Sequence, residues 1–201
     1  MKAFRLALVL VSLITGCAVV TVKKPAGDKP AELDPALWSG SWIGADSAKC
    51  AMRILDEKKS VVEFRGKQPD EREDVVTLTV NELGDRLVAT VKETEDESCL
   101  FFRIAISNDH LALFMPNEKL LKEAVEKGLL AGRVIKPERP KDPKAMPIGG
   151  DQTILEQFGS AEAGKLGGVL QCFEPDPGLV YIREKAPPPP AAKPKKSERR
   201  K

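Results

Sequence analysis

The sequence predicts a mainly β protein: a small antiparallel meander or barrel of about six strands, with one or two short helices and a terminal hairpin. The clearest sign is segment 100–106, where every second residue from Leu100 to Ile106 is apolar, a pattern typical of a half-buried strand. Five further segments are rich in β-forming residues and are separated by short turns: 50–55, 61–65, 74–80, 87–91 and 110–114. Short strands joined by short turns are typical of an antiparallel meander.

The hydrophobic period changes after the last of these strands. Asn117 is a favourable N-cap and Gly128 a favourable C-terminal glycine, so we expect a helix over 118–127. Three further elements are expected beyond it: a strand at 129–135, a short helix capped by Asp151 and ended by Gly159, and a terminal hairpin of 167–173 with 179–183.

The first sixteen residues have the layout of a secretory signal. Lys2 and Arg5 precede an apolar run that is too short to span a bilayer as a helix. The residues that follow, Ile-Thr-Gly-Cys at 14–17, resemble the lipobox of bacterial lipoproteins. The resemblance implies cleavage before Cys17 and acylation of Cys17, for example with palmitate, so that the lipid bilayer becomes a partner of the chain. The alternative is an ordinary signal peptide that ends near a cysteine by chance.

The lipobox resemblance also implies a location. Ala18 follows the cysteine, where an aspartate would suggest retention in the inner membrane. We therefore expect a lipid-anchored protein of the bacterial envelope, at the outer membrane and facing the periplasm.

These features divide the chain into four parts: a signal peptide at 1–16, an acyl-anchored flexible tether at 17–36, a β-rich globular domain at 37–184 and a Pro-rich, basic, disordered tail at 185–201. Prolines interrupt the tether, and no hydrophobic period runs through it. As a flexible coil, it would hold the domain roughly 25 Å from the membrane.

Charge is distributed unevenly along the chain. The whole sequence has 32 basic and 30 acidic residues, but the tail from Lys185 onward carries a net charge of +6. Six of its basic residues are candidates for contact with an anionic envelope component, namely lipopolysaccharide, anionic lipid or peptidoglycan: Lys193, Lys195, Lys196, Arg199, Arg200 and Lys201. The alternative is a solubilising arm without a partner. Nucleic acid is not an expected partner, because an exported chain meets little of it.

Three cysteines follow the lipobox. Cys50 and Cys99 each open a predicted strand, and in a closed meander these two strand starts lie at one end, so Cys50 and Cys99 are the favoured disulfide pair. Cys172 is expected in the core. Burial of all three as small apolar residues is the alternative.

The residue pattern points to no catalytic group, metal site or cofactor. His110 is the only histidine, and no nucleophile motif accompanies it. The cysteines lack the paired spacing of zinc ligands, and the acidic residues cluster in turns, where solvent keeps them ionised. An enzyme is therefore not expected.

Gly40, Ser41 and Trp42, at the start of the domain, resemble the Gly-x-Trp of the first strand of lipocalins. That resemblance implies an eight-stranded barrel that holds a small apolar ligand. Together, these observations favour a non-enzymatic binding or assembly-accessory module whose partner is an envelope component or envelope protein. The alternatives are a lipocalin-like carrier or sensor of a small apolar ligand, and an inhibitor of an envelope hydrolase that acts through loop 136–150.

Overall fold

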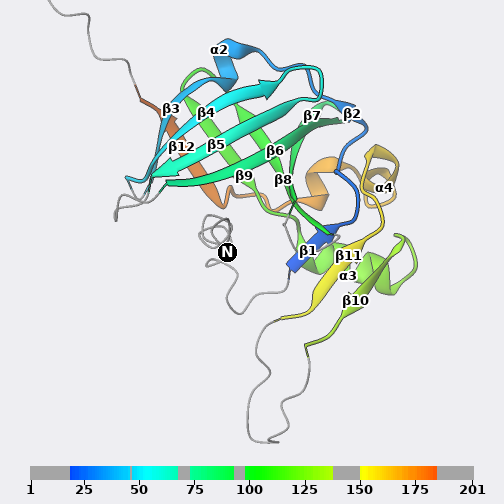
Figure 1. The fold of residues 1–201 in the computed structure, drawn as a ribbon. Helices are drawn as coiled ribbons and strands as arrows, with labels where there is room; N and C mark the ends of the chain where they lie inside the picture. Colours follow the sequence, from blue (N-terminus) through cyan, green and yellow to red (C-terminus); the bar gives the residue numbers. More distant parts are fainter. Residues whose placement is uncertain (1–18, 46, 68–72, 93–97, 138–149, 185–201) are drawn as a thin grey trace, which may run out of the picture.

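A computed structural model describes residues 19–45, 47–67, 73–92, 98–137 and 150–184. Its main feature is a closed antiparallel barrel (Figure 1). The barrel strands, in spatial order, are β3 (Gly40–Gly44), β4 (Lys49–Asp56), β5 (Val61–Lys67), β6 (Glu73–Leu83), β7 (Arg86–Lys92), β8 (Cys99–Ile106), β9 (His110–Phe114) and β12 (Leu179–Arg183). The mainly β prediction is confirmed, but the barrel has eight strands and not about six.

The two strands missing from the predicted meander are those that close the barrel. Strand β3 is short and begins and ends with glycine, so its sequence carries little β signal. Strand β12 pairs with β3 on one side and with β9 on the other. The expected terminal hairpin is therefore wrong: its first half contains the 3-10 helix η1 (Val169–Cys172), and β12 pairs with strands far away in sequence.

The barrel interior is filled with apolar side chains, and two tryptophans mark the end where β3 begins. Helix α2 (Pro35–Trp38) lies at this end, and both Trp38 and Trp42 are buried in the barrel core (Figure 1). The Arg183 guanidinium lies 4.5 Å from the Trp42 ring centroid. It also donates hydrogen bonds to the carbonyl oxygens of Leu37, at 2.6 Å, and Ser39, at 3.0 Å. Arg183 thus ties the last barrel strand to the residues that begin the first.

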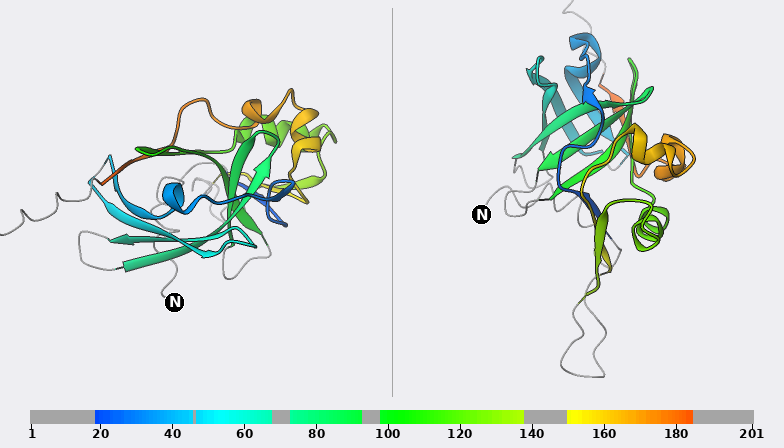
Figure 2. Two further views of the ribbon diagram at one scale, coloured as in Figure 1. Left: turned by 90° about the horizontal axis from the view of Figure 1, so that it is seen from above. Right: turned by 90° about the vertical axis from the view of Figure 1, so that its right-hand side faces the viewer.

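Three strands extend the same sheet outside the barrel. This extension, the wing sheet, consists of β1 (Val19–Val22), β11 (Gln152–Leu155) and β10 (Gly132–Ile135), and β1 joins it to the first residues of β8. Helices α3 (Glu118–Glu126) and α4 (Ser160–Gly164) lie on the same side of the barrel (Figure 2). An outer core of aromatic and aliphatic side chains, with Phe101, Phe158 and Phe173 in mutual contact, fills the space between.

Helix α3 confirms the helix expected over 118–127. The Asn117 side chain accepts a hydrogen bond from the Leu120 amide at 3.0 Å, as an N-cap should. Gly128 follows the helix with a φ of +72°, a left-handed conformation that favours glycine. The expected strand at 129–135 is present in its second half as β10.

Two predictions in the flanking segments are wrong, and the wing sheet explains both. The expected tether at 17–36 is structured from residue 19 onward, because β1 pairs with β11 and β8 and buries Val20 and Val22. Further along, the short strand β2 (Lys29–Pro30) pairs with β6. The helix expected after Asp151 is strand β11, which has a partner strand on each side.

Candidate interaction surface

One pocket lies among the inward-facing side chains of the barrel. It measures about 20 Å³, close to the volume of one water molecule. The lining comes from inward-facing residues of six strands: Met52, Phe64, Val76, Leu78, Phe102, Ile104, Leu111, Leu113 and Tyr181. A small-molecule site normally offers several hundred Å³. With these side-chain positions, this pocket has no room for a ligand of that size.

An apolar patch lies instead on the outer face of the closing strand. Val180 and Ile182 of β12 point outward and are 37% and 56% exposed. Strand register places Ala112 opposite Val180, Ile43 opposite Ile182, and Ala105 opposite Ala112. We call these five residues the closure patch: Ile43, Ala105, Ala112, Val180 and Ile182.

Polar residues border the closure patch. His110 pairs with Ile182 across strands β9 and β12, is exposed, and its backbone amide donates to the Ser107 hydroxyl at 3.1 Å. Lys49 pairs with Ile43 and forms an ion pair with Glu184 at 2.6 Å. An apolar centre with a polar rim is the usual anatomy of a protein–protein contact.

The sequence contained part of the signal for this patch. In segment 179–182 every residue is apolar, so both faces of a strand there carry apolar side chains. Only one of those faces can point into a barrel. The contribution of Ile43 and Ala112 depends on long-range strand pairing, which the pattern within 179–182 does not specify.

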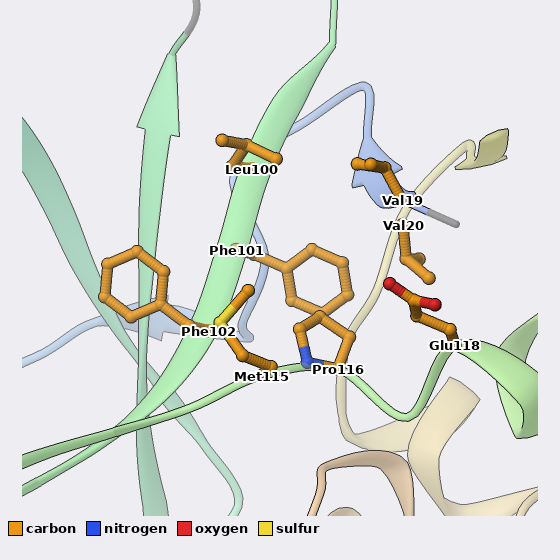
Figure 3. Close-up of a pocket in the computed structure, with 8 residues that line it drawn as sticks. All are labelled: Val19, Val20, Leu100, Phe101, Phe102, Met115, Pro116 and Glu118. Atoms are coloured by element: carbon orange, nitrogen blue, oxygen red, sulfur yellow. The ribbon is translucent and has the colours of Figure 1, made fainter. Parts of the chain in front are cut away.

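A second pocket lies between the barrel and the wing sheet. It has a volume of about 30 Å³, and its lining comes from β1, β8, the connection between β9 and α3, and the first residue of α3 (Figure 3). The lining residues are Val19, Val20, Leu100, Phe101, Phe102, Met115, Pro116 and Glu118. Glu118 is the only ionisable group among them. Its burial, and secondarily the charge of Glu174, raise the pKa of the Glu118 carboxyl above its usual range.

Glu118→Gln is therefore expected to stabilise the protein at neutral pH. Because the pKa of Glu118 is higher in the folded state, ionising it costs stability above that pKa, and the cost disappears below the unfolded pKa of roughly 4.3. The neutral amide avoids this cost. Urea denaturation at pH 7 should show a higher midpoint for the variant, and at pH 3 the two midpoints should converge. A lower midpoint at pH 7, with Glu123→Gln on the same helix as control, would contradict the assignment.

The two cysteines of the favoured disulfide pair lie on opposite sides of the barrel wall. Cys50 belongs to the barrel core and Cys99 to the outer core. Side chains alternate along β8, so Cys99 points outward while the next residue, Leu100, points into the barrel. Cys172 is fully buried as expected, and burial raises the pKa of its thiol to about 11.

Other sequence-based candidates fall outside the described residues. These are Cys17, the basic tail residues and the centre of loop 136–150. Within the described residues, no group of three or more His, Cys, Asp or Glu side chains is placed to hold a metal ion. None of the helices in the described part of the chain is both long enough and apolar enough to cross a membrane. No family model, curated protein or solved structure matches the chain.

Proposed function

We propose that this protein is a lipid-anchored lipoprotein of the bacterial envelope that acts as a non-enzymatic binding module, with the closure patch as its contact for a protein partner. The exposure of Val180 and Ile182, side by side with Ile43 and Ala112 on neighbouring strands, is the observation that carries this proposal. A contiguous exposed apolar patch costs solubility unless another molecule covers it.

The anchor in this proposal is Cys17, acylated as in lipoproteins of the outer membrane. Two or three acyl chains hold a protein at a bilayer essentially permanently. The basic tail provides a second, charge-directed contact with an anionic envelope component through the six residues from Lys193 to Lys201.

The filled barrel favours this binding module over a carrier of small ligands. A ligand of ordinary size would have to displace several of the side chains around the 20 Å³ cavity, each of which packs against its neighbours. The alternative inhibitory role would depend on loop 136–150, most of which the structure does not describe.

Site-specific photocrosslinking in the native envelope tests the proposed contact. A photoreactive residue at position 182 of the full-length protein is expected to yield a discrete crosslinked protein species. Position 55 is the matched control, because Leu55 is 47% exposed on the outer face of β4, near the Arg53–Glu63 ion pair. The same species from both positions, or none from position 182, would contradict the proposal.

A further inference from the structure

The first described residue of the chain is held firmly in the wing sheet. The Val19 amide donates to the Asp151 carbonyl at 3.0 Å, and Val19 pairs with Gln152. The three residues that follow it in β1 are buried. Cys17 is only two residues away, so an acyl group on Cys17 starts within about 7 Å of Val19. Only Ala18 therefore separates the folded domain from the residue that carries the acyl group.

Among the described residues, the short distance places the end of the wing sheet where β1 begins close to the bilayer. Val19, Gln152 and Ile135 form one row across the wing sheet, at the end where β1 begins. Neighbouring strands are about 4.8 Å apart, so Ile135 lies about 10 Å from Val19. We call this row, together with Lys136, the anchor edge.

The side chains at the anchor edge are of the kinds found at a membrane interface. Ile135 is 40% exposed, and the exposed Arg133 lies on the same face of β10, two residues before it. Lys136, also exposed, comes directly after Ile135. An apolar side chain flanked by two cations can insert between headgroups while the cations contact lipid phosphates.

Among the described residues, two acidic groups near this edge, Asp151 and Glu118, oppose the contact little. The Asp151 carboxylate is paired with Lys122 at 2.5 Å. Glu118 lies in the wall of the neighbouring pocket, where Figure 3 shows it beside Val20, and burial favours its neutral form.

We infer that the anchor edge is a membrane-contact surface, which holds the domain directly on a bilayer with anionic phosphate headgroups. This inference rests on the proposed acylation of Cys17. The sequence pattern predicted a domain held away from the membrane by a flexible tether. In the inferred arrangement the domain has a fixed orientation, and the barrel wall opposite β8 faces away from the membrane. Strand β4 lies in that opposite wall, four strands from β8 around the barrel.

Fluorescence quenching by lipid-attached quenchers tests the orientation. The full-length acylated protein, as the Ile135→Cys or the Leu55→Cys variant with an environment-sensitive label, is reconstituted into vesicles of phosphatidylglycerol and phosphatidylethanolamine. Both positions are similarly exposed, at 40% and 47%. The label at 135 is expected to be quenched severalfold more than the label at 55. Equal quenching at the two positions would overturn the inference.

Two further experiments distinguish acylation of Cys17 from the orientation of the domain on the membrane. Co-flotation of the protein with the vesicles at high salt, which screens the contacts of the basic tail and of the anchor edge with phosphatidylglycerol, and its loss in Cys17→Ser report on acylation. If the protein floats but position 135 is not selectively quenched, the anchor stands and the contact surface is wrong.

A flexible insertion of twenty Gly and Ser residues between Ala18 and Val19 adds roughly 25 Å of reach. It should keep co-flotation and reduce the quenching at 135, and unchanged quenching would refute the role of the short connection.

Discussion

Trp42→Ala is expected to lower the free energy of unfolding by about 3–5 kcal/mol, the usual cost of truncating a fully buried tryptophan. Trp42 is 0% exposed and lies inside the barrel at the end where β3 begins. Truncation leaves a cavity there and removes the ring on which the Arg183 guanidinium rests. Chemical denaturation followed by far-UV circular dichroism measures the loss.

Trp42→Phe is the matched control for this truncation. The buried Trp42 Nε1–H has no hydrogen-bond partner among the described residues, so the indole carries a desolvation cost that a phenyl ring avoids. The phenyl ring also keeps an aromatic face for Arg183. We expect Trp42→Phe to cost much less than Trp42→Ala. Similar losses for the two variants would show that ring volume and the contact with Arg183 do not stabilise this end of the barrel.

Strands that pair with their neighbours in the chain were predictable from sequence. Each of β4 to β8 pairs with the next strand, and all six strands from β4 to β9 carry their own β-forming residues, so the local sequence pattern predicted all six. Strand β12 was predicted as a strand at 179–183 but with the wrong partner, because it pairs with β3 and β9, far away in sequence. The Gly-x-Trp resemblance implied eight strands, and on strand number it was the better guide.

Local sequence patterns also did not predict that the outward-facing side chains of β8 are buried. The segment reads as a half-buried strand, yet Phe101 and Phe102 are both buried, one in each core. Even Arg103 is 9% exposed, with its guanidinium 3.5 Å from the Phe114 ring centroid. The wing sheet and helix α3 cover this face, and their segments lie both before and after β8 in the chain. For the same reason the sequence predicted neither the closure patch nor the anchor edge.

Val22→Asp is expected to lower the free energy of unfolding by at least about 3 kcal/mol, because it places an unpaired charge in an apolar core. Val22 is 0% exposed and pairs with Leu155 on one side and Cys99 on the other. A carboxylate there is desolvated among the apolar side chains of the outer core. Urea denaturation gives the overall loss, and amide exchange in β11 shows whether the wing sheet opens first.

Lys24→Asp is the matched control, because its comparison with Val22→Asp distinguishes a structured strand from a flexible tether. Positions 22 and 24 are two residues apart, but Lys24 is exposed and lies beyond the end of β1. If residues 19–24 formed a tether, aspartate would be harmless at both positions, because neither side chain would be buried. In the structure, only position 22 faces the outer core, so only Val22→Asp should destabilise the protein strongly. Equal, small effects at both positions would contradict strand β1, and with it the short connection that places the anchor edge against the membrane.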